Sequence, residues 1–136
     1  MTNGHNDWGV EYSSIIWFEN QFFESHKNVA SVERSRDIVL TVNRKKQADK
    51  VEVLLVNVYA FGISDYYRAK AEFPSVKCIV QNGKWNKFTG DALSQAICDE
   101  IGLFTPGELH AALWKDNAVG RRKTAKRTSS VSWRTS

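Results

Sequence analysis

Residues 76–113 carry an ordered series of four structural signals, and this series limits the fold more than any other part of the chain. Residues 76–80 form an apolar run typical of a buried strand, and residues 89–98 place apolar side chains at helical spacing. Leu103–Phe104 predicts a short second strand, and Pro106 suits the first turn of a last helix. Alternating strands and helices predict an α/β domain in which helices cover a sheet.

Strand signals fill much of the first half of the chain. Residues 29–42 predict two strands or one long bent strand, and the polar residues 43–50 predict a hairpin turn. Residues 51–60 are long, apolar and rich in β-branched side chains, which is typical of a strand. We therefore expect the hairpin turn to join two neighbouring strands.

Two helices complete this pattern. The first is predicted before residue 28, with Ser13 and Ser14 as candidate N-cap residues. The second is predicted after Gly62, with Ser64 as its cap and Pro74 as its end.

The net charge of +4 is unevenly distributed along the 136 residues. Residues 115–136 hold seven Lys or Arg and one acid, whereas residues 1–114 hold twelve basic and fourteen acidic residues. A polar, basic segment of this kind buries too little apolar surface to fold alone, so we expect a disordered tail there. A solubilising terminus explains the tail as well as a phosphate-binding arm does, and the candidate contacts of such an arm are Arg121, Arg122, Lys123, Lys126 and Arg127.

The remaining composition predicts one cytoplasmic domain. We expect a flexible N-terminus over residues 1–12, a domain over 13–114 and the basic tail over 115–136. No run approaches the ~18 apolar residues of a membrane span, and the polar start does not read as a signal peptide, so no membrane partner is expected. Cys78 and Cys98 lie in apolar patterns, so we interpret both as reduced core thiols.

The order helix, strands, helix, strand, helix, strand, helix resembles the restriction-endonuclease-like fold. Residues 78–113 are similar to the C-terminal part of Mrr-type nucleases, where a strand leads to an aromatic–Thr pair, a helix with alanines four apart, a short apolar strand and a small helix. The residues that carry this resemblance are Phe88–Thr89, Ala92, Ala96, Ile101–Gly102–Leu103–Phe104 and Glu108–Leu109, with Trp17–Phe18–Glu19 similar to the family's opening helix. The resemblance covers residues 15–114 and implies a single domain with a mixed central sheet flanked by helices.

The resemblance also implies a catalytic pattern, an acid on one strand and Glu/Gln-x-Lys on the next, with acids that hold magnesium. Asp37 stands at the place of the strand acid and would be the metal ligand. Asn57 and Tyr59 stand where Glu/Gln and Lys belong, and side chains two apart on a strand share a face. Glu19, from the first helix, or Glu33 would add a second carboxylate. Because an amide and a phenol replace an acid and an amine, we expect a weakened or rebuilt nuclease centre.

A non-catalytic interpretation exists for each of these residues. Asp37 would pair with Arg34 or Arg36 at the start of a strand. Asn57 would hydrogen-bond to a neighbouring loop, and Tyr59 would be a partly buried ring with a satisfied hydroxyl.

Residues 81–88 follow the carboxyl end of a predicted central strand, where ligands of open α/β sheets bind. Lys84, Trp85 and Lys87 are candidate contacts to a nucleic-acid phosphate or base. The alternative is a turn in which Trp85 and Phe88 cover the edge of the core. The three histidines make no zinc-ligand spacing, and we expect them at the surface.

Together these features favour a nucleic-acid-binding protein with a nuclease-like fold. We expect it to bind DNA more than RNA, and a homodimer is a possible form. It would be a magnesium-dependent phosphodiesterase if the rebuilt centre is active. The alternative is a non-catalytic module, dimerising or inhibitor-like, that binds another protein.

Overall fold

The computed structural model describes residues 8–36, 38–81 and 86–114. Consecutive strands fill most of residues 29–61, and strands and helices follow one another after residue 62, as the sequence predicts. In chain order they are α1 (Tyr12–Trp17), the π-helical segment η1 (Phe18–Phe22), β1 (Val29–Ser35), β2 (Val39–Arg44), β3 (Lys50–Val56), β4 (Ala60–Phe61), α2 (Ile63–Glu72), β5 (Cys78–Gln81), β6 (Lys87–Phe88), α3 (Gly90–Cys98), β7 (Gly102–Phe104) and α4 (Pro106–Ala112).

A mixed sheet of five strands in the order β1-β2-β3-β5-β7 forms the centre of the domain. The strands β1, β2 and β3 form an antiparallel meander, and β5 and β7 continue the sheet parallel to β3. A separate pair of short parallel strands, β4 and β6, lies beyond the main sheet. The expectation of a single mixed α/β domain with helices flanking a sheet is confirmed.

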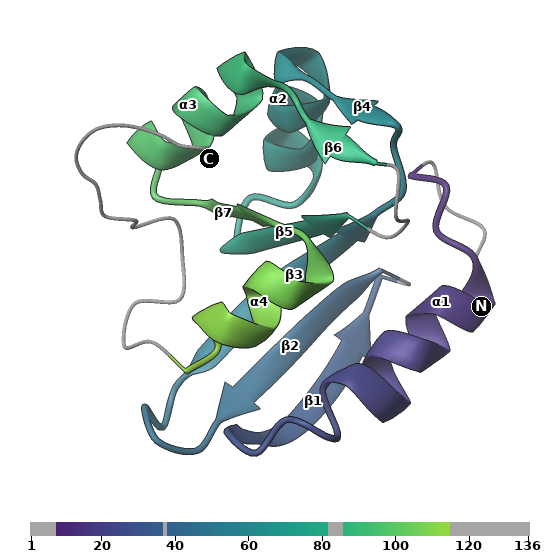
Figure 1. Ribbon diagram of the computed structural model, residues 1–136, viewed down its shortest axis with the longest axis vertical. Helices are drawn as coiled ribbons and strands as arrows, with labels where there is room; N and C mark the ends of the chain where they lie inside the picture. Colours follow the sequence, from purple (N-terminus) through teal and green to yellow (C-terminus); the bar gives the residue numbers. More distant parts are fainter. Residues whose placement is uncertain (1–7, 37, 82–85, 115–136) are drawn as a thin grey trace.

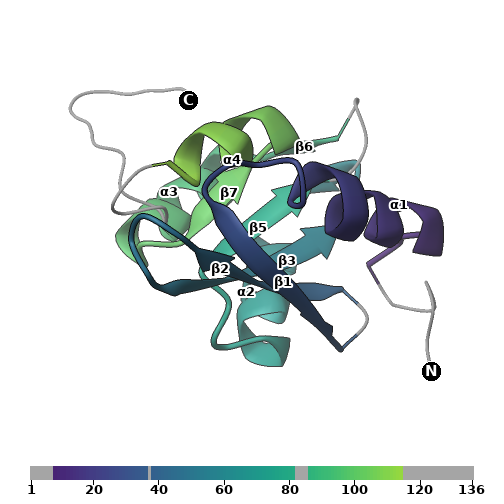
Figure 2. The same ribbon diagram turned by 90° about the horizontal axis from the view of Figure 1, so that it is seen from below.

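Helices cover both faces of this sheet (Figure 1 and Figure 2). The crossovers from β3 through α2 to β5 and from β5 through α3 to β7 step in the same direction, so their usual right-handedness places α2 and α3 on one face. The other face carries α1, η1 and α4, and the rings of Phe22 and His110 meet there at 6.0 Å. β5 is buried at all four of its positions, as a central strand covered on both faces must be.

Residues 8–12, which were predicted to belong to a flexible N-terminus, pack against the rest of the domain. Trp8 and Val10 are buried in the core. The Trp8 ring stacks under the Arg68 guanidinium at 3.9 Å and lies 6.1 Å from the Phe61 ring. A Trp buries more apolar surface than most side chains, so one such residue anchors the polar segment around it.

The first helix differs from its prediction in two ways. Its N-cap residue is Glu11, so Ser13 and Ser14 lie inside the helix and neither is the N-cap. The helix then widens into η1, where the Phe23 N–H donates to the Phe18 oxygen at 3.0 Å. This wider turn lets both Phe18 and Phe23 face the core, with their rings 6.2 Å apart.

Of the two alternatives for residues 29–42, two strands is confirmed, because the chain turns at Arg36 with φ of 49°. Two other predicted boundaries differ from the structure. The strand that begins at Lys50 ends at Val56 and not at residue 60. The cap of α2 is Gly62, whose N–H donates to the Asp65 carboxylate at 3.0 Å, so Ser64 is not the cap. By contrast, the predicted start of α4 at Pro106 is confirmed.

Both cysteines are free, and one of them lies where the sequence placed it. Burial of Cys78 raises the pKa of its thiol to about 12, as expected for a core thiol. Cys98 is exposed near the end of α3, so its assignment to the core is wrong. None of the helices in the described part of the chain combines the length and apolar character of a bilayer span.

The two ends of the sheet differ in what they carry. At the carboxyl edge, defined by Val56, Gln81 and Phe104, the strands β3, β5 and β7 end and the chain turns toward the starts of α2, α3 and α4. At the amino edge the same strands begin, the β2–β3 hairpin turns, and α4 ends.

Candidate functional site

Asn57 lies directly after β3 at the carboxyl edge, and its hydrogen bonds hold two other segments there. Its side-chain nitrogen donates to the Gly9 oxygen at 3.0 Å, and its backbone N–H donates to the Trp8 oxygen at 2.8 Å. Its side-chain oxygen accepts a short hydrogen bond from the Asn86 amide. Asn57 therefore does what the non-catalytic interpretation expects, and it joins neighbouring loops to the end of β3.

Gly9 lies close to the backbone of Asn57. It has φ of 72°, and a Cβ at this position would lie 2.9 Å from the Asn57 backbone oxygen. Trp8 anchors the same segment on α2, because its indole nitrogen donates to the Glu72 carboxylate at 3.1 Å. Residues 8–9 thus lie against the end of β3, next to the place where the resemblance puts the nuclease centre.

The other described candidates are divided between two places. Tyr59 is 70% exposed, not partly buried, and its backbone oxygen accepts from the N–H of the exposed Lys87 at 3.0 Å. Asn57, Tyr59 and Lys87 therefore lie on the same edge of the sheet. Glu19 lies on η1 and forms an ion pair with Arg34 of β1 at 3.7 Å.

Several candidates lie outside the described residues: Asp37, Lys84, Trp85, Arg121, Arg122, Lys123, Lys126 and Arg127. Their proposed roles stay predictions. The neighbour of Asp37, Arg36, donates to the Glu72 oxygen at 2.9 Å and stacks on the Phe73 ring at 4.5 Å.

Gln81 is a buried residue at this edge that the sequence reasoning missed. Its side-chain oxygen accepts from the Val58 N–H at 3.1 Å, and its nitrogen donates to the Val58 oxygen at 2.7 Å and to the Lys87 oxygen at 3.3 Å. The side-chain amide therefore bridges Val58, which follows β3, and Lys87 of β6, as a backbone amide does between strands. The available signal was a single amide at the end of an otherwise apolar strand.

The described polar side chains at the carboxyl edge have structural hydrogen bonds. The side-chain oxygens of Asn57 and Gln81 accept from the Asn86 amide and from the Val58 N–H. The carboxylates of Asp65, Asp91 and Glu108 accept hydrogen bonds from backbone N–H groups where helices begin. Within residues 8–36, 38–81 and 86–114, no three His, Cys, Asp or Glu side chains gather as metal ligands would.

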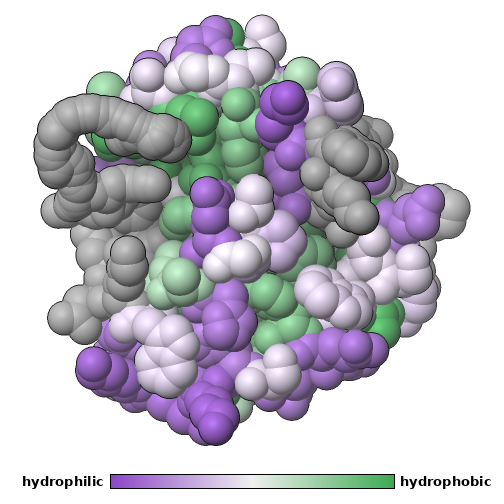
Figure 3. Space-filling model, in the orientation of Figure 1, coloured by the Kyte–Doolittle hydropathy of each residue, from purple (hydrophilic) through white to green (hydrophobic). Residues whose placement is uncertain are grey.

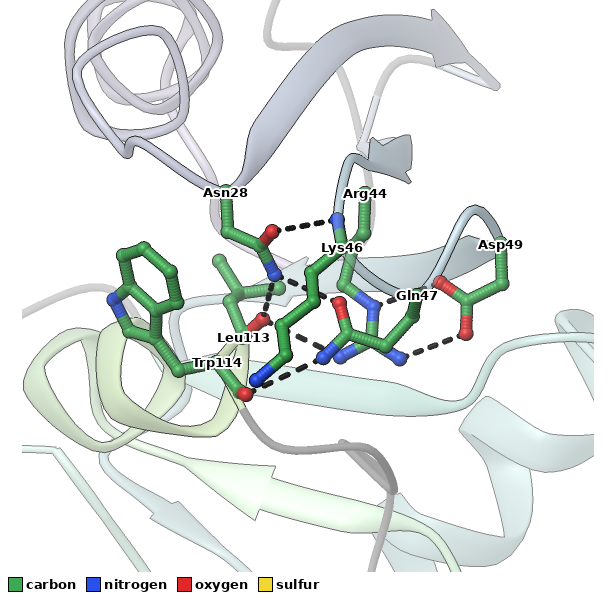
Figure 4. Close-up of polar contacts among 7 residues, drawn as sticks. All are labelled: Asn28, Arg44, Lys46, Gln47, Asp49, Leu113 and Trp114. Carbon is green, nitrogen blue, oxygen red and sulfur yellow. Dashed lines mark hydrogen bonds and ion pairs between the residues drawn. The ribbon is translucent and has the colours of Figure 1, made fainter.

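A second polar cluster lies at the amino edge (Figure 4). We call it the hairpin clamp. It consists of the side chains of Asn28, Arg44, Gln47 and Asp49 together with the backbone oxygens of Leu113 and Trp114.

Asn28 is the centre of the hairpin clamp and is almost fully buried. Its side-chain nitrogen donates to the Leu113 oxygen and to the Gln47 side-chain oxygen, both at 2.8 Å. Its side-chain oxygen accepts from the Lys46 N–H at 2.9 Å, and its backbone oxygen accepts from the Lys45 N–H at 2.8 Å. One residue therefore connects the start of β1, the hairpin and the end of α4.

Arg44 and Asp49 form a bidentate ion pair across the hairpin turn. Arg44 donates from Nε to one carboxylate oxygen at 2.8 Å and from a terminal nitrogen to the other at 2.7 Å. The arginine side chain is 1% exposed, and its other terminal nitrogen reaches the Leu113 oxygen at 3.3 Å. The hydrogen-bonded guanidinium lowers the pKa of the Asp49 carboxyl.

His26 borders the hairpin clamp and is 2% exposed, so its expected surface position is wrong. Its Nδ1 accepts from the Asn28 N–H at 3.1 Å, so its Nε2 carries the proton and donates to the His110 oxygen at 2.9 Å. Burial lowers the pKa of His26, which favours this neutral form. The Trp114 ring lies 5.1 Å from the His26 ring.

Exposed lysines lie in the two segments that form the hairpin clamp. Lys27, Lys45, Lys46 and Lys50 are all exposed, and Trp114 is 45% exposed beside them. In the orientation of Figure 1, the end that carries the β2–β3 hairpin is lined with hydrophilic side chains (Figure 3). Within the hairpin, Asp49 is the acidic residue and is paired with Arg44.

Three comparisons with known proteins find no match for this chain. No protein-family model matches the chain, and neither a curated protein nor a solved structure matches it.

Proposed function

We propose that this chain is a restriction-endonuclease-like domain that binds nucleic acid, DNA more than RNA, and has lost efficient cleavage. The observation that carries the proposal is the order of its elements. A helix, a three-stranded meander, and then β5 and β7 with helices before and after each follow the order on which the resemblance rests.

The contacts of Asn57 support the loss of cleavage. The family pattern uses a side-chain oxygen at this place as a metal ligand, whereas the Asn57 side-chain oxygen accepts from Asn86 and its side-chain nitrogen donates to the Gly9 oxygen. Tyr59 stands in the place of the lysine, and a phenol lacks the positive charge that a lysine brings to the attacked phosphate. We therefore assign Asn57 to the structure of the carboxyl edge and not to catalysis.

The distribution of positive charge supports nucleic-acid binding. Lysines gather at the amino edge, and seven more basic residues follow in positions 115–136. Lysine and arginine that neutralise phosphates release counterions, so binding of this kind weakens steeply as salt rises.

Retention and cleavage assays test the proposal. The full chain is incubated with plasmid, single-stranded DNA and RNA, with magnesium, with manganese and with chelator. Salt-sensitive retention without cutting is the expected result. Metal-dependent cutting that disappears in Asp37→Ala would show an active nuclease and overturn the loss of cleavage, while absence of any retention would overturn nucleic-acid binding.

A protein-interaction module is the competing function, and exposed aromatic rings favour it. Tyr12 and Trp17 of α1 are 44% and 42% exposed, and the Tyr12 ring lies beside Arg34 of the edge strand β1. Sedimentation of the purified chain at several concentrations tests the homodimer form of this idea. A dimer that dissociates in Trp17→Ala, together with no retention of nucleic acid, would favour it over our proposal.

A further inference from the structure

We infer that the nucleic-acid-binding surface of this domain lies at the amino edge and not at the carboxyl edge where nuclease-like chemistry is expected. We call this surface the hairpin platform. It consists of Lys27, Lys45, Lys46, Lys50 and Trp114. This inference rests on the proposed function, and it assigns that function to a particular surface.

Backbone contacts hold the members of the hairpin platform together. The N–H groups of Lys45 and Lys46 both donate to Asn28, which directly follows Lys27. Asn28 and Gln47 also donate to the oxygens of Leu113 and Trp114. The lysines therefore come from two segments that are joined at Asn28, and Trp114 is joined to the hairpin through Gln47.

The charge of the hairpin itself favours the same assignment, while Asp99 and Glu100 lie farther along the amino edge, before β7. At the carboxyl edge, Asp65, Asp91 and Glu108 stand in the first turns of α2, α3 and α4. Acids in a first turn stabilise a helix, but they repel phosphate. In the hairpin, the negative charge of Asp49 is balanced by Arg44, so Lys45, Lys46 and Lys50 contribute uncompensated positive charge there.

The basic residues 115–136 follow the hairpin clamp in the chain. They start directly after Trp114, whose backbone oxygen accepts from Gln47 at 3.3 Å. Their seven Lys and Arg residues add positive charge to a chain that already carries the hairpin lysines.

Trp114 adds a ring to this charged surface. Its indole stacks near His26 on one side and keeps 45% of its surface exposed. Aromatic rings beside lysines bind single-stranded nucleic acid by stacking on bases of any sequence. The hairpin platform therefore fits single-stranded or frayed nucleic acid, bound without sequence preference.

Charge-matched variants of the full chain test this assignment. The variant K45Q/K46Q removes two lysines from the hairpin platform, and K70Q/K87Q removes two from α2 and β6. Binding to labelled single-stranded DNA is measured by fluorescence anisotropy between about 50 mM and about 200 mM salt. Thermal melts followed by circular dichroism show that each variant is folded.

We expect K45Q/K46Q to weaken binding about tenfold at the lower salt and to reduce the slope of log affinity against log salt by about two thirds of a unit per lost contact. We expect K70Q/K87Q to bind nearly as the unchanged protein does. Trp114→Ala should weaken binding of single-stranded DNA more than of duplex, and Trp114→Phe should restore most of the loss.

The possible failures are distinguishable. If the unchanged protein binds no nucleic acid, the proposed function fails and this inference fails with it. If the protein binds but K70Q/K87Q weakens binding as much as K45Q/K46Q or more, the proposed function stands and the hairpin platform is wrong.

Discussion

The side chain of Asn28 donates a hydrogen bond of 2.8 Å to the backbone oxygen of Leu113, which joins the start of β1 to the end of α4. The two residues are 85 positions apart in the chain, and both are buried. The bond satisfies one of the carbonyl groups that every helix leaves unpaired at its C-terminal end.

Replacing Asn28 by Ala should destabilise the domain by about 2–3 kcal/mol, because the buried Leu113 oxygen loses a donor and the part-buried Lys46 N–H loses its acceptor. Urea unfolding followed by tryptophan fluorescence measures the change. Asn43→Ala is the matched control, since its amide donates to the Ser31 hydroxyl at the surface. Loss of only about 0.5 kcal/mol in the control is expected, and equal losses in both variants would contradict the central role of Asn28.

Replacing Gly9 by Ala should cost about 1–3 kcal/mol of stability, since a Cβ there meets the Asn57 oxygen at 2.9 Å and φ is 72°. Gly107→Ala is the matched control. It lies in α4 with nothing within 4 Å of an added Cβ, so it should be neutral or slightly stabilising. Differential scanning calorimetry compares the two. An unchanged melting temperature in Gly9→Ala would show that residues 8–9 are not held against Asn57.

Changing Asn57 to Asp should lower stability by about 1–2 kcal/mol and should not produce nuclease activity. The aspartate keeps an acceptor for Asn86, but it loses the donor to the Gly9 oxygen and places negative charge against that oxygen. If Asn57 were instead a weak metal ligand, the stronger ligand would increase metal-dependent cutting. Unfolding and plasmid-cleavage measurements on the same preparation separate these results.

Stability should decrease as the pH falls from about 7.5 toward 5, because burial lowers the pKa of His26 in the folded state. The unfolded chain then binds a proton more readily than the folded chain, so each step down in pH favours unfolding. Protonation of Nδ1 would also break its bond with the Asn28 N–H, and the His110 ring at 4.3 Å adds repulsion when charged. Urea midpoints across this pH range measure the effect.

The variant His26→Gln should flatten this part of the pH profile, and His110→Gln should retain most of it. Asp49 contributes at lower pH and with the same direction. Arg44 lowers the pKa of its carboxyl, so its stabilisation is present above the unfolded pKa and is lost as the pH falls through the lowered one. A profile that His26→Gln leaves unchanged would assign the pH dependence elsewhere.

Local patterns in the chain were sufficient to predict the order of the α-helices and of the strands of the five-stranded sheet, but not η1, β4 or β6. Apolar periodicity and turn residues act within a few positions, so α3 with its cap at Thr89 and α4 with its start at Pro106 follow from neighbouring residues. The same locality explains the prediction of a hairpin over residues 43–50, where β2 ends and β3 begins.

Long-range packing decided the use of individual polar residues. Nothing near Asn57 in the chain shows that it meets Gly9, and nothing near Asn28 shows that it meets Leu113, because each contact joins segments that only the folded sheet brings together. An exposed and a buried amide look alike in a sequence, yet a buried one must find partners wherever the fold supplies them. The chain's own patterns therefore define the layers of this domain, while tertiary contacts assign Asn57, Gln81 and Asn28 to structural roles.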